Sequence, residues 1–125
     1  MSEKVLVLGA SLKTERYSNI AINMLLDYDH QVIAVGKRKG NIRGVEISNQ
    51  MDLYTNIDTV TLYLNPDNQV PFKSYIKNLR PKRVIFNPGT ENPEFVSDLN
   101  KLGIQTEIAC TLVLLRTDQF SISID

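Results

Sequence analysis

The sequence is poor in features that mark several classes of protein. Its 125 residues include one cysteine, Cys110, so no disulfide can form within the chain, which favours a reducing, cytoplasmic setting. No apolar run approaches the roughly 20 residues of a membrane helix, and the first residues lack the apolar core of a signal peptide. Fourteen cations balance fourteen carboxylates, which argues against a surface dedicated to nucleic acid or membrane.

Candidate catalytic residues are also scarce. The single histidine, His30, has no second histidine for a metal site or a triad, and we expect it on the surface of a turn. Cys110 is expected to be an inert thiol at a strand end rather than a nucleophile. Among the acids near helix starts, only Glu91 is kept as a candidate, because such acids usually complement a helix dipole. No catalytic or metal-binding residue is predicted, and the sequence leaves enzyme activity undecided, with binding alone the simpler interpretation.

Five short apolar runs are instead the main feature of the chain. Three of them are nearly continuous in valine, isoleucine, leucine and phenylalanine, as in parallel strands that helices cover on both faces. The runs are 4–9, 31–36, 59–64, 83–87 and 104–109.

Helical segments are predicted between these runs. Ser18–Asp27 has helical apolar spacing, with Ser18 as the expected N-cap. Asn65-Pro66 and Asn92-Pro93 each place a capping asparagine before a proline at the first helical position. The first of these helices is expected to run towards Leu79 and the second to stop at Gly103.

This alternation predicts a single α/β domain, residues 1–125, with a Rossmann-like three-layer fold. The expected sheet has five parallel strands in the order 3-2-1-4-5, and the alternating tail 119–125 could add an edge strand. Ligands of such sheets bind at the carboxyl ends of the strands, where the strand order reverses. We therefore expect the loops after Leu8 and Phe86 to face one another around a ligand.

The first of these loops has features of an anion site. Gly9 lets the backbone turn sharply and lets a ligand approach it closely. Ser11 and Ser18 offer hydroxyl donors, and a helix start favours negative charge. Arg16 offers a planar fork that suits a diphosphate.

A basic segment follows the second run. Lys37, Arg38, Lys39 and Arg43 place four cations within seven positions, where an NAD-binding fold would carry an acid for the ribose. Two of the three glycines of the dinucleotide fingerprint are also missing after the first run. The segment suits a phosphate on the ribose, either the 2′-phosphate of NADP or the 3′-phosphate of coenzyme A.

The chain resembles the small stand-alone CoA-binding proteins, which are Rossmann-like domains similar to the CoA-binding domain of succinyl-CoA synthetase alpha subunits. The resemblance covers nearly the whole chain and is most specific in its first half. The residues that carry it are Gly9-Ala10-Ser11, Glu15-Arg16-Tyr17-Ser18, Lys39-Gly40, Gly44-Val45-Glu46-Ile47, Asn87-Pro88-Gly89 and Cys110.

The resemblance implies that the chain binds coenzyme A or an acyl-CoA as a non-catalytic binding, sensor or accessory module. The sequence differs from the family's usual pattern at three places: after the second run (Gly36-Lys37), after the fourth run (Asn87-Pro88) and beyond Cys110. The alternatives are an NADP-binding oxidoreductase or regulator and a ligand-free dimeric scaffold. The expected partners are a nucleotide-type small molecule, a second copy of the chain or an acyl-CoA enzyme. The expected ligand contacts are Gly9, Ala10, Ser11, Arg16, Ser18, Lys37, Lys39, Asn65, Pro88 and Gly89.

Overall fold

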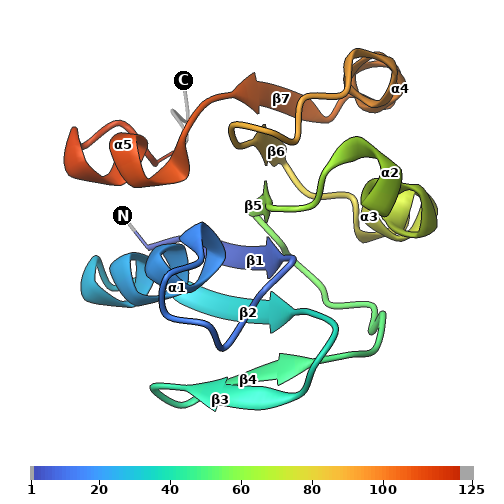
Figure 1. The fold of residues 1–125 in the computed structure, drawn as a ribbon. Coiled ribbons are helices and arrows are strands. Elements are labelled where there is room, and N and C mark those ends of the chain that lie inside the picture. The colour runs from blue at the N-terminus through green and yellow to red at the C-terminus, as the bar shows by residue number, and fades with distance from the viewer. Residues whose placement is uncertain (1, 122–125) are drawn as a thin grey trace.

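The computed structural model describes residues 2–121 and has the predicted three-layer α/β architecture (Figure 1). The strands are β1 (Lys4–Leu8), β2 (Gln31–Val35), β3 (Gly40–Ile42), β4 (Val45–Ser48), β5 (Thr59–Leu62), β6 (Arg83–Phe86) and β7 (Gln105–Ile108). The helices are α1 (Tyr17–Asp27), α2 (Pro66–Gln69), the 3₁₀ turn η1 (Val70–Phe72), α3 (Lys73–Leu79), α4 (Pro93–Lys101) and α5 (Thr111–Arg116).

The seven strands form one sheet in the order β3-β4-β2-β1-β5-β6-β7. All neighbours are parallel except β3 and β4, which form an antiparallel hairpin at one edge. The five predicted strands are all present. Their carboxyl ends lie along one edge of the sheet, because parallel strands share a direction.

The predicted strand order is wrong in one respect. The strand at 59–62 (β5) pairs with β1, whereas the sequence analysis placed it beyond β2. The place beside β2 is taken by β4, whose Ile47 pairs with Ala34. The loop after β5 therefore lies next to the loop after β1, and the loop after β6 lies one strand farther away.

The hairpin was missed because its residues were interpreted as a basic loop. Arg43 and Gly44 both have positive φ, at 52° and 92°, which is the geometry of a tight hairpin turn. Asn41 stabilises the turn, because its side-chain oxygen accepts the Gly44 N–H at 2.9 Å. The three residues of β3 and the four residues of β4 were too few to produce a strand signal in the sequence.

Helices cover both faces of the sheet. Figure 1 shows α1 and α5 on one face, and α2, α3 and α4 on the other. Side chains of alternating strand positions enter the two layers, so that Val5 and Val7 contact the α1/α5 layer while Leu6 and Leu8 contact the α3/α4 layer. Among the described residues, no helix is long and apolar enough to cross a membrane.

The two asparagine caps are confirmed, but the serine cap is wrong. The side chains of Asn65 and Asn92 accept the N–H groups of Asn68 and Phe95. The N-cap of α1 is Arg16, and Ser18 lies inside the helix, where it is buried. The predicted helix towards Leu79 is divided into α2, η1 and α3, because proline at 71 cannot donate the helical hydrogen bond.

Two expectations concern the end of the chain. Residues 111–116 form α5, a helix that was not predicted from the sequence. The expected edge strand in the tail falls mainly on residues 122–125, which lie outside the described part.

Candidate functional site

At the carboxyl edge of the sheet, the loop after β1 packs against the loops after β2 and β5. Gly9 has φ +97°, and its N–H donates to the Val35 carbonyl at the end of β2. A Cβ at Gly9 would lie 3.1 Å from the backbone carbon of Tyr63 and 3.2 Å from a Leu64 methyl. The predicted role of Gly9 in a sharp turn is thus explained by contacts to the loops after β2 and β5.

The loop after β2 approaches the β1 loop even more closely. A Cβ at Gly36 would lie 2.3 Å from the Ala10 carbonyl oxygen, which is a prohibitive distance. A Cβ at Gly40 would lie 2.5 Å from the side chain of Leu12. Ala10 itself is buried, and its N–H also donates to Val35. The missing side chain at Gly36 allows the two loops to touch, whereas the exposed Leu12 side chain can move away from a Cβ at Gly40.

The β1 loop is ordered by its own hydrogen bonds. The Ser11 hydroxyl accepts the Lys13 N–H at 3.1 Å, and the Ser11 carbonyl accepts a bond from the buried Asn19 amide at 2.9 Å. Arg16 caps α1 with its backbone carbonyl, while its side chain is exposed. Asn19 was not singled out in the sequence, although it fixes the loop from inside the helix.

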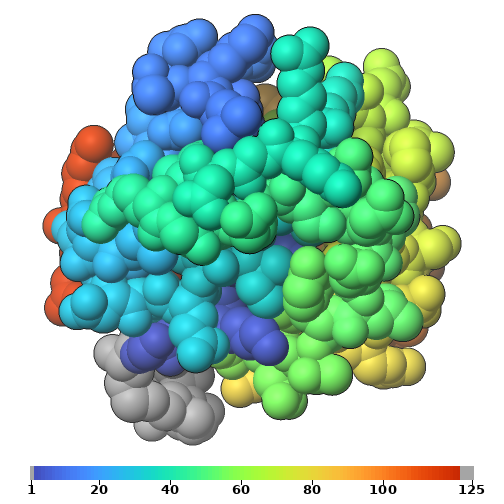
Figure 2. Space-filling view, turned by 90° about the horizontal axis from the view of Figure 1, so that it is seen from below, coloured from blue at the N-terminus to red at the C-terminus, as the bar shows by residue number. Residues whose placement is uncertain are grey.

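Cations gather on these loops. Lys13 and Arg16 of the β1 loop and Lys37, Arg38 and Lys39 of the β2 loop are exposed, and within residues 2–121 none has an ion-pair partner. In Figure 2 the β1 loop and the segment after β2 project side by side at the top, with a notch between them.

Arg43 does not belong to this group of cations. Its guanidinium pairs with Asp27 at 2.9 Å and donates to the Asn23 carbonyl at 3.1 Å, on the side of α1. The basic segment of the sequence therefore has two parts. Residues 37–39 lie at the carboxyl edge, and Arg43 connects the β3–β4 hairpin to α1.

The predicted contacts beyond β5 and β6 occupy two linked loops. Asn65 is exposed but caps α2, and Pro88 and Gly89 are exposed after β6. The Gly89 N–H donates to the Glu91 carboxylate at 2.7 Å, so Glu91 binds its own loop. Gln69, which is fully buried, joins the two loops by donating to the carbonyls of Leu64 and Thr90 at 2.8 and 2.7 Å.

A buried polar network below the loops was missed by the sequence analysis. Asn87 donates to the Thr61 hydroxyl at 2.8 Å and to the Leu62 carbonyl at 3.0 Å, and it accepts the Thr111 N–H at 2.8 Å. The hydroxyls of Thr61 and Thr111 bond to each other at 2.8 Å. The one sequence feature that could have indicated this network is the position of Asn87, a polar residue directly after an apolar strand and so at the carboxyl edge of the sheet.

Tyr63 is placed beside this network. In the described part of the chain its hydroxyl is the single buried side-chain polar atom without a hydrogen-bond partner. Burial raises the pKa of the Tyr63 phenol to about 12, so it stays protonated at neutral pH. The Thr61 and Thr111 hydroxyls oppose this effect of burial and lower the Tyr63 pKa.

The arrangement contains few groups suited to catalysis. Cys110 is half-buried and free, as the N-cap of α5. His30 is buried rather than exposed as predicted, and it lies at the opposite edge, where its Nδ1 accepts the Glu3 N–H. Within residues 2–121 no three histidine, cysteine, aspartate or glutamate side chains form a cluster able to hold a metal ion.

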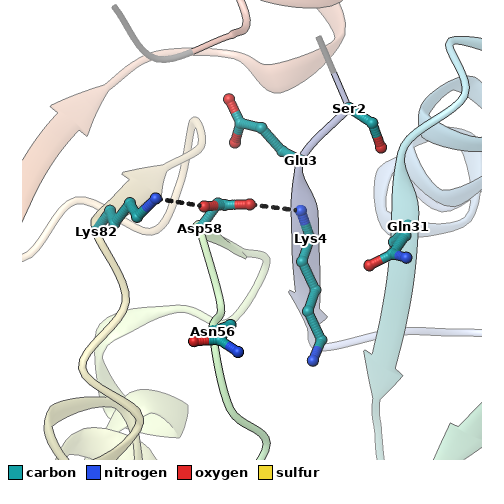
Figure 3. Close-up of a pocket in the computed structure, with 7 residues that line it drawn as sticks. All are labelled: Ser2, Glu3, Lys4, Gln31, Asn56, Asp58 and Lys82. Atoms are coloured by element: carbon teal, nitrogen blue, oxygen red, sulfur yellow. Dashed lines mark hydrogen bonds and ion pairs between the residues drawn. The ribbon is translucent and has the colours of Figure 1, made fainter. Parts of the chain in front are cut away.

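A polar hollow of about 530 Å³ lies at the amino edge, away from these loops. Figure 3 shows that Asp58 is held there between Lys82, at 3.0 Å, and the Lys4 N–H, at 2.8 Å. The Lys4 ammonium also donates to the Thr55 carbonyl. The charges of the hollow are thus largely paired within the chain, and they give no reason to place a nucleotide there.

Solved structures with the same fold match nearly the whole length of this chain. A crystal structure of an uncharacterized protein is 46% identical, with a TM-score of 0.94 over 96% of this chain and 99% of that one. Protein ID.343 from Thermus thermophilus is 23% identical, with a TM-score of 0.84 over 95% of this chain and 91% of that one. No curated protein is significantly similar.

A larger enzyme contains a domain of the same fold. The dinucleotide forming acetyl-coenzyme A synthetase 1 of Ca. Korarchaeum cryptofilum, solved with phosphate and ADP, is 16% identical with a TM-score of 0.70. The match covers 83% of this chain but 25% of that one. The family model described as the CoA binding domain matches residues 3–116, which is nearly the whole chain. The chain therefore belongs to the CoA binding domain family.

Proposed function

We propose that the chain binds coenzyme A or an acyl-CoA at the carboxyl edge of the sheet, as a binding module without catalysis of its own. The observation that carries the proposal is the family match over residues 3–116, together with a β1 loop that packs against the loops after β2 and β5 at the expected edge. The ligand contacts proposed at this edge, including the start of α1 and the loop after β6, are Gly9, Ala10, Ser11, Arg16, Ser18, Lys37, Lys39, Asn65, Pro88 and Gly89.

The charges and donors of the loops support this ligand. Coenzyme A carries a diphosphate and a 3′-phosphate, and both need countercharge in a partly exposed site. Arg16 lies at the start of α1, whose unpaired N–H groups and dipole favour a diphosphate. Lys37 and Lys39 project from the adjacent loop and suit the 3′-phosphate. Ser18 is buried, so its proposed contact depends on its backbone more than on its hydroxyl.

Isothermal titration calorimetry with coenzyme A, dephospho-coenzyme A, NADP and NAD tests the proposal. Dephospho-coenzyme A lacks the 3′-phosphate, so we expect it to bind more weakly than coenzyme A. The Lys39→Ala variant should lose about 5–10-fold in affinity for coenzyme A, since one charge-assisted contact contributes roughly 1–1.5 kcal/mol. Its affinity for dephospho-coenzyme A should change little.

Lys101→Ala is the matched control, because this lysine is exposed in the last turn of α4 and outside the three loops. Tighter binding of NADP than of coenzyme A would overturn the ligand assignment. Absence of binding by all four nucleotides, together with a stable dimer in light scattering, would favour a ligand-free scaffold. Turnover of acetyl-CoA by the pure chain would contradict the absence of catalysis.

A further inference from the structure

A buried aromatic side chain anchors the segment that follows α5. Phe120 is 3% exposed, and its ring lies between the His30 imidazole, with centroids 5.0 Å apart, and the Arg83 guanidinium, at 4.8 Å from the ring centroid. The contacts bring the end of the described chain against the amino edge of the sheet. Residues 117–121, which follow α5, are called the clasp segment below.

The arginine side of this anchor carries a permanent charge. The Arg83 Nη2 donates to the Phe120 carbonyl at 2.7 Å, and Nε donates to the Thr59 hydroxyl at 3.1 Å. Ion pairs with Glu3 at 3.5 Å and Glu107 at 3.2 Å balance the guanidinium. Because arginine stays protonated in proteins, the guanidinium keeps its charge and its contact with Phe120 when the pH falls.

The histidine side of the anchor requires a neutral ring. His30 is 8% exposed, and its Nδ1 accepts the Glu3 backbone N–H at 2.9 Å. A ring nitrogen that accepts a hydrogen bond carries no proton, so the proton of the neutral ring is on Nε2. Protonation of Nδ1 would place two N–H groups against each other, and the imidazole would have to leave its place beside Phe120.

The charges around His30 act in both directions. Burial is the largest influence and lowers its pKa below 6.5, and the Arg83 and α-amino charges act in the same sense. The carboxylates of Glu3 and Asp29 oppose it. Asp118, with Tyr28 and Phe120, lines a hollow of about 190 Å³ next to the ring. The net effect keeps the imidazole neutral at neutral pH, as the hydrogen bond from Glu3 requires.

We propose that His30 and Phe120 form an acid-sensitive clasp: the neutral imidazole holds the clasp segment on the sheet, and protonation of His30 releases it. The release frees the end of α5, whose start remains tied to Asn87 through the Thr111 N–H. The device lies at the edge opposite the proposed ligand site, so it does not depend on the identity of that ligand.

Hydrogen exchange of the Gln119 amide reports on the clasp, because this N–H donates to the Leu114 carbonyl at 2.8 Å. Its protection factor, corrected for the intrinsic pH dependence of exchange, should fall about tenfold between about pH 7.5 and 5. His30 is the one histidine of the sequence, so its ring signals in a two-dimensional NMR titration need no assignment. Its pKa should lie below 6.5 and should coincide with the midpoint of the loss of protection.

Two variants separate the histidine from its neighbouring acids. In His30→Asn the amide oxygen takes the place of Nδ1 and accepts the Glu3 N–H without titrating, so protection should stay within about twofold over the same range. In the double variant Asp29→Asn, Asp118→Asn the loss of protection should persist. Both aspartates have positive φ, at 65° and 57°, a conformation that asparagine adopts readily.

The proposal is overturned by a His30 pKa at or above 6.5, or by unchanged protection in the wild-type chain. Equal loss of protection in wild type and His30→Asn would assign the effect to the carboxylates and would also overturn it. If His30→Asn does not fold, the wild-type data decide: a midpoint away from the His30 pKa contradicts the clasp, and a coincident midpoint that the double aspartate variant retains supports it.

Discussion

Arg83 and Lys82 are neighbours in the sequence with opposite surroundings. The Arg83 side chain is 3% exposed and pairs with the buried Glu3, whereas the Lys82 side chain is 72% exposed and pairs with Asp58 near the surface. Breaking a buried pair leaves an uncompensated charge in a medium that solvates it poorly, while a surface pair contributes little. The same chemical change should therefore have very different effects at the two positions.

We expect Arg83→Leu to lower the free energy of unfolding by about 3–5 kcal/mol, because it removes the guanidinium charge that balances the buried Glu3 carboxylate. Lys82→Leu should lower it by less than about 1 kcal/mol. Urea unfolding followed by circular dichroism measures both values. Similar losses in the two variants would show that Arg83 is not part of a buried ion pair in solution.

Gly36 provides a second contrast within the chain. We expect Gly36→Ala to destabilise the fold by about 1–3 kcal/mol and to weaken coenzyme A binding, because the new methyl collides with the Ala10 carbonyl and separates two loops of the site. Gly44→Ala is the control. A Cβ at Gly44 would meet no neighbouring atom, but the φ of +92° is strained for alanine. This substitution should therefore lower the free energy of unfolding by about 1–2 kcal/mol without changing the affinity for coenzyme A. Calorimetry on both variants measures the affinity, and an unchanged value for Gly36→Ala would contradict the loop contact as part of the site.

Some residue roles could be predicted from the sequence and others could not. The caps Asn65 and Asn92 are local, because each bonds to an N–H three residues away and the following proline marks the helix start. The burial of His30 and Gln69 is not local. Their partners, Glu3 and Thr90, lie 27 and 21 residues away, so no pattern around either residue reveals them.

At the scale of elements, strand β6 holds helix α5 at both ends. Asn87, which follows β6, accepts the N–H of Thr111 at the start of the helix, and Arg83, which begins β6, binds the Phe120 carbonyl beyond its end. A helix of six residues is too short to be stable alone, so these ties and its packing on α1 account for it. The apolar run 112–115 is likewise too short to predict a helix from the sequence.

Substitution of Asn87 is therefore expected to destabilise the fold strongly, because this side chain attaches α5 to β6. Asn87→Ala should cost about 2–3 kcal/mol, because it leaves the Leu62 carbonyl and the Thr111 N–H buried without partners. Asn100→Ala, whose side chain accepts an exposed bond from Thr106, should cost less than about 0.5 kcal/mol. Thermal unfolding of both variants distinguishes the two, and equal midpoints would refute the tie.

The sheet order shows why element-level reasoning succeeded only in part. Five of the seven strands were recognised by their apolar runs, because parallel strands that helices cover need no strict alternation. The β3–β4 hairpin, with its charged and polar residues, produced no such run. The predicted order followed the nucleotide-binding halves of doubly wound folds and so placed β5 on the wrong side of the sheet. The loop after β5 had still been assigned to the ligand through the family resemblance.

At the scale of the whole molecule, the two edges of the sheet differ in the way their charges are used. The carboxyl edge carries five exposed cations without ion-pair partners among the described residues, and the amino edge carries Arg83, Lys82 and Asp58 in pairs. Although the net charge is zero, the charges are unevenly distributed: the cations of the carboxyl edge are available to anions, and the charges of the amino edge stabilise the fold through ion pairs.

Two groups at the amino edge, His30 and Asp58, should each lower the free energy of unfolding in a separate range of acid pH. The folded pKa of His30 is lowered by burial, so below pH 6.5 the unfolded chain takes up the proton first and stability falls until the folded pKa is reached. The folded pKa of Asp58 is also lowered, since the Lys4 N–H, Lys82 and Arg83 together outweigh its partial burial. Its contribution is present above pH 3.8 and is lost as the pH falls further.

Urea unfolding between about pH 7.5 and 3 measures these steps in three proteins. Wild type should lose stability in both ranges, His30→Asn only in the lower range, and Asp58→Asn only in the upper range, since each substitution replaces one titrating group by a neutral amide. Loss of the upper step in Asp58→Asn, or its retention in His30→Asn, would show that another group titrates there. Independent steps would mean that the clasp responds to mild acid while the Asp58 pairs still hold β1 and β5 together.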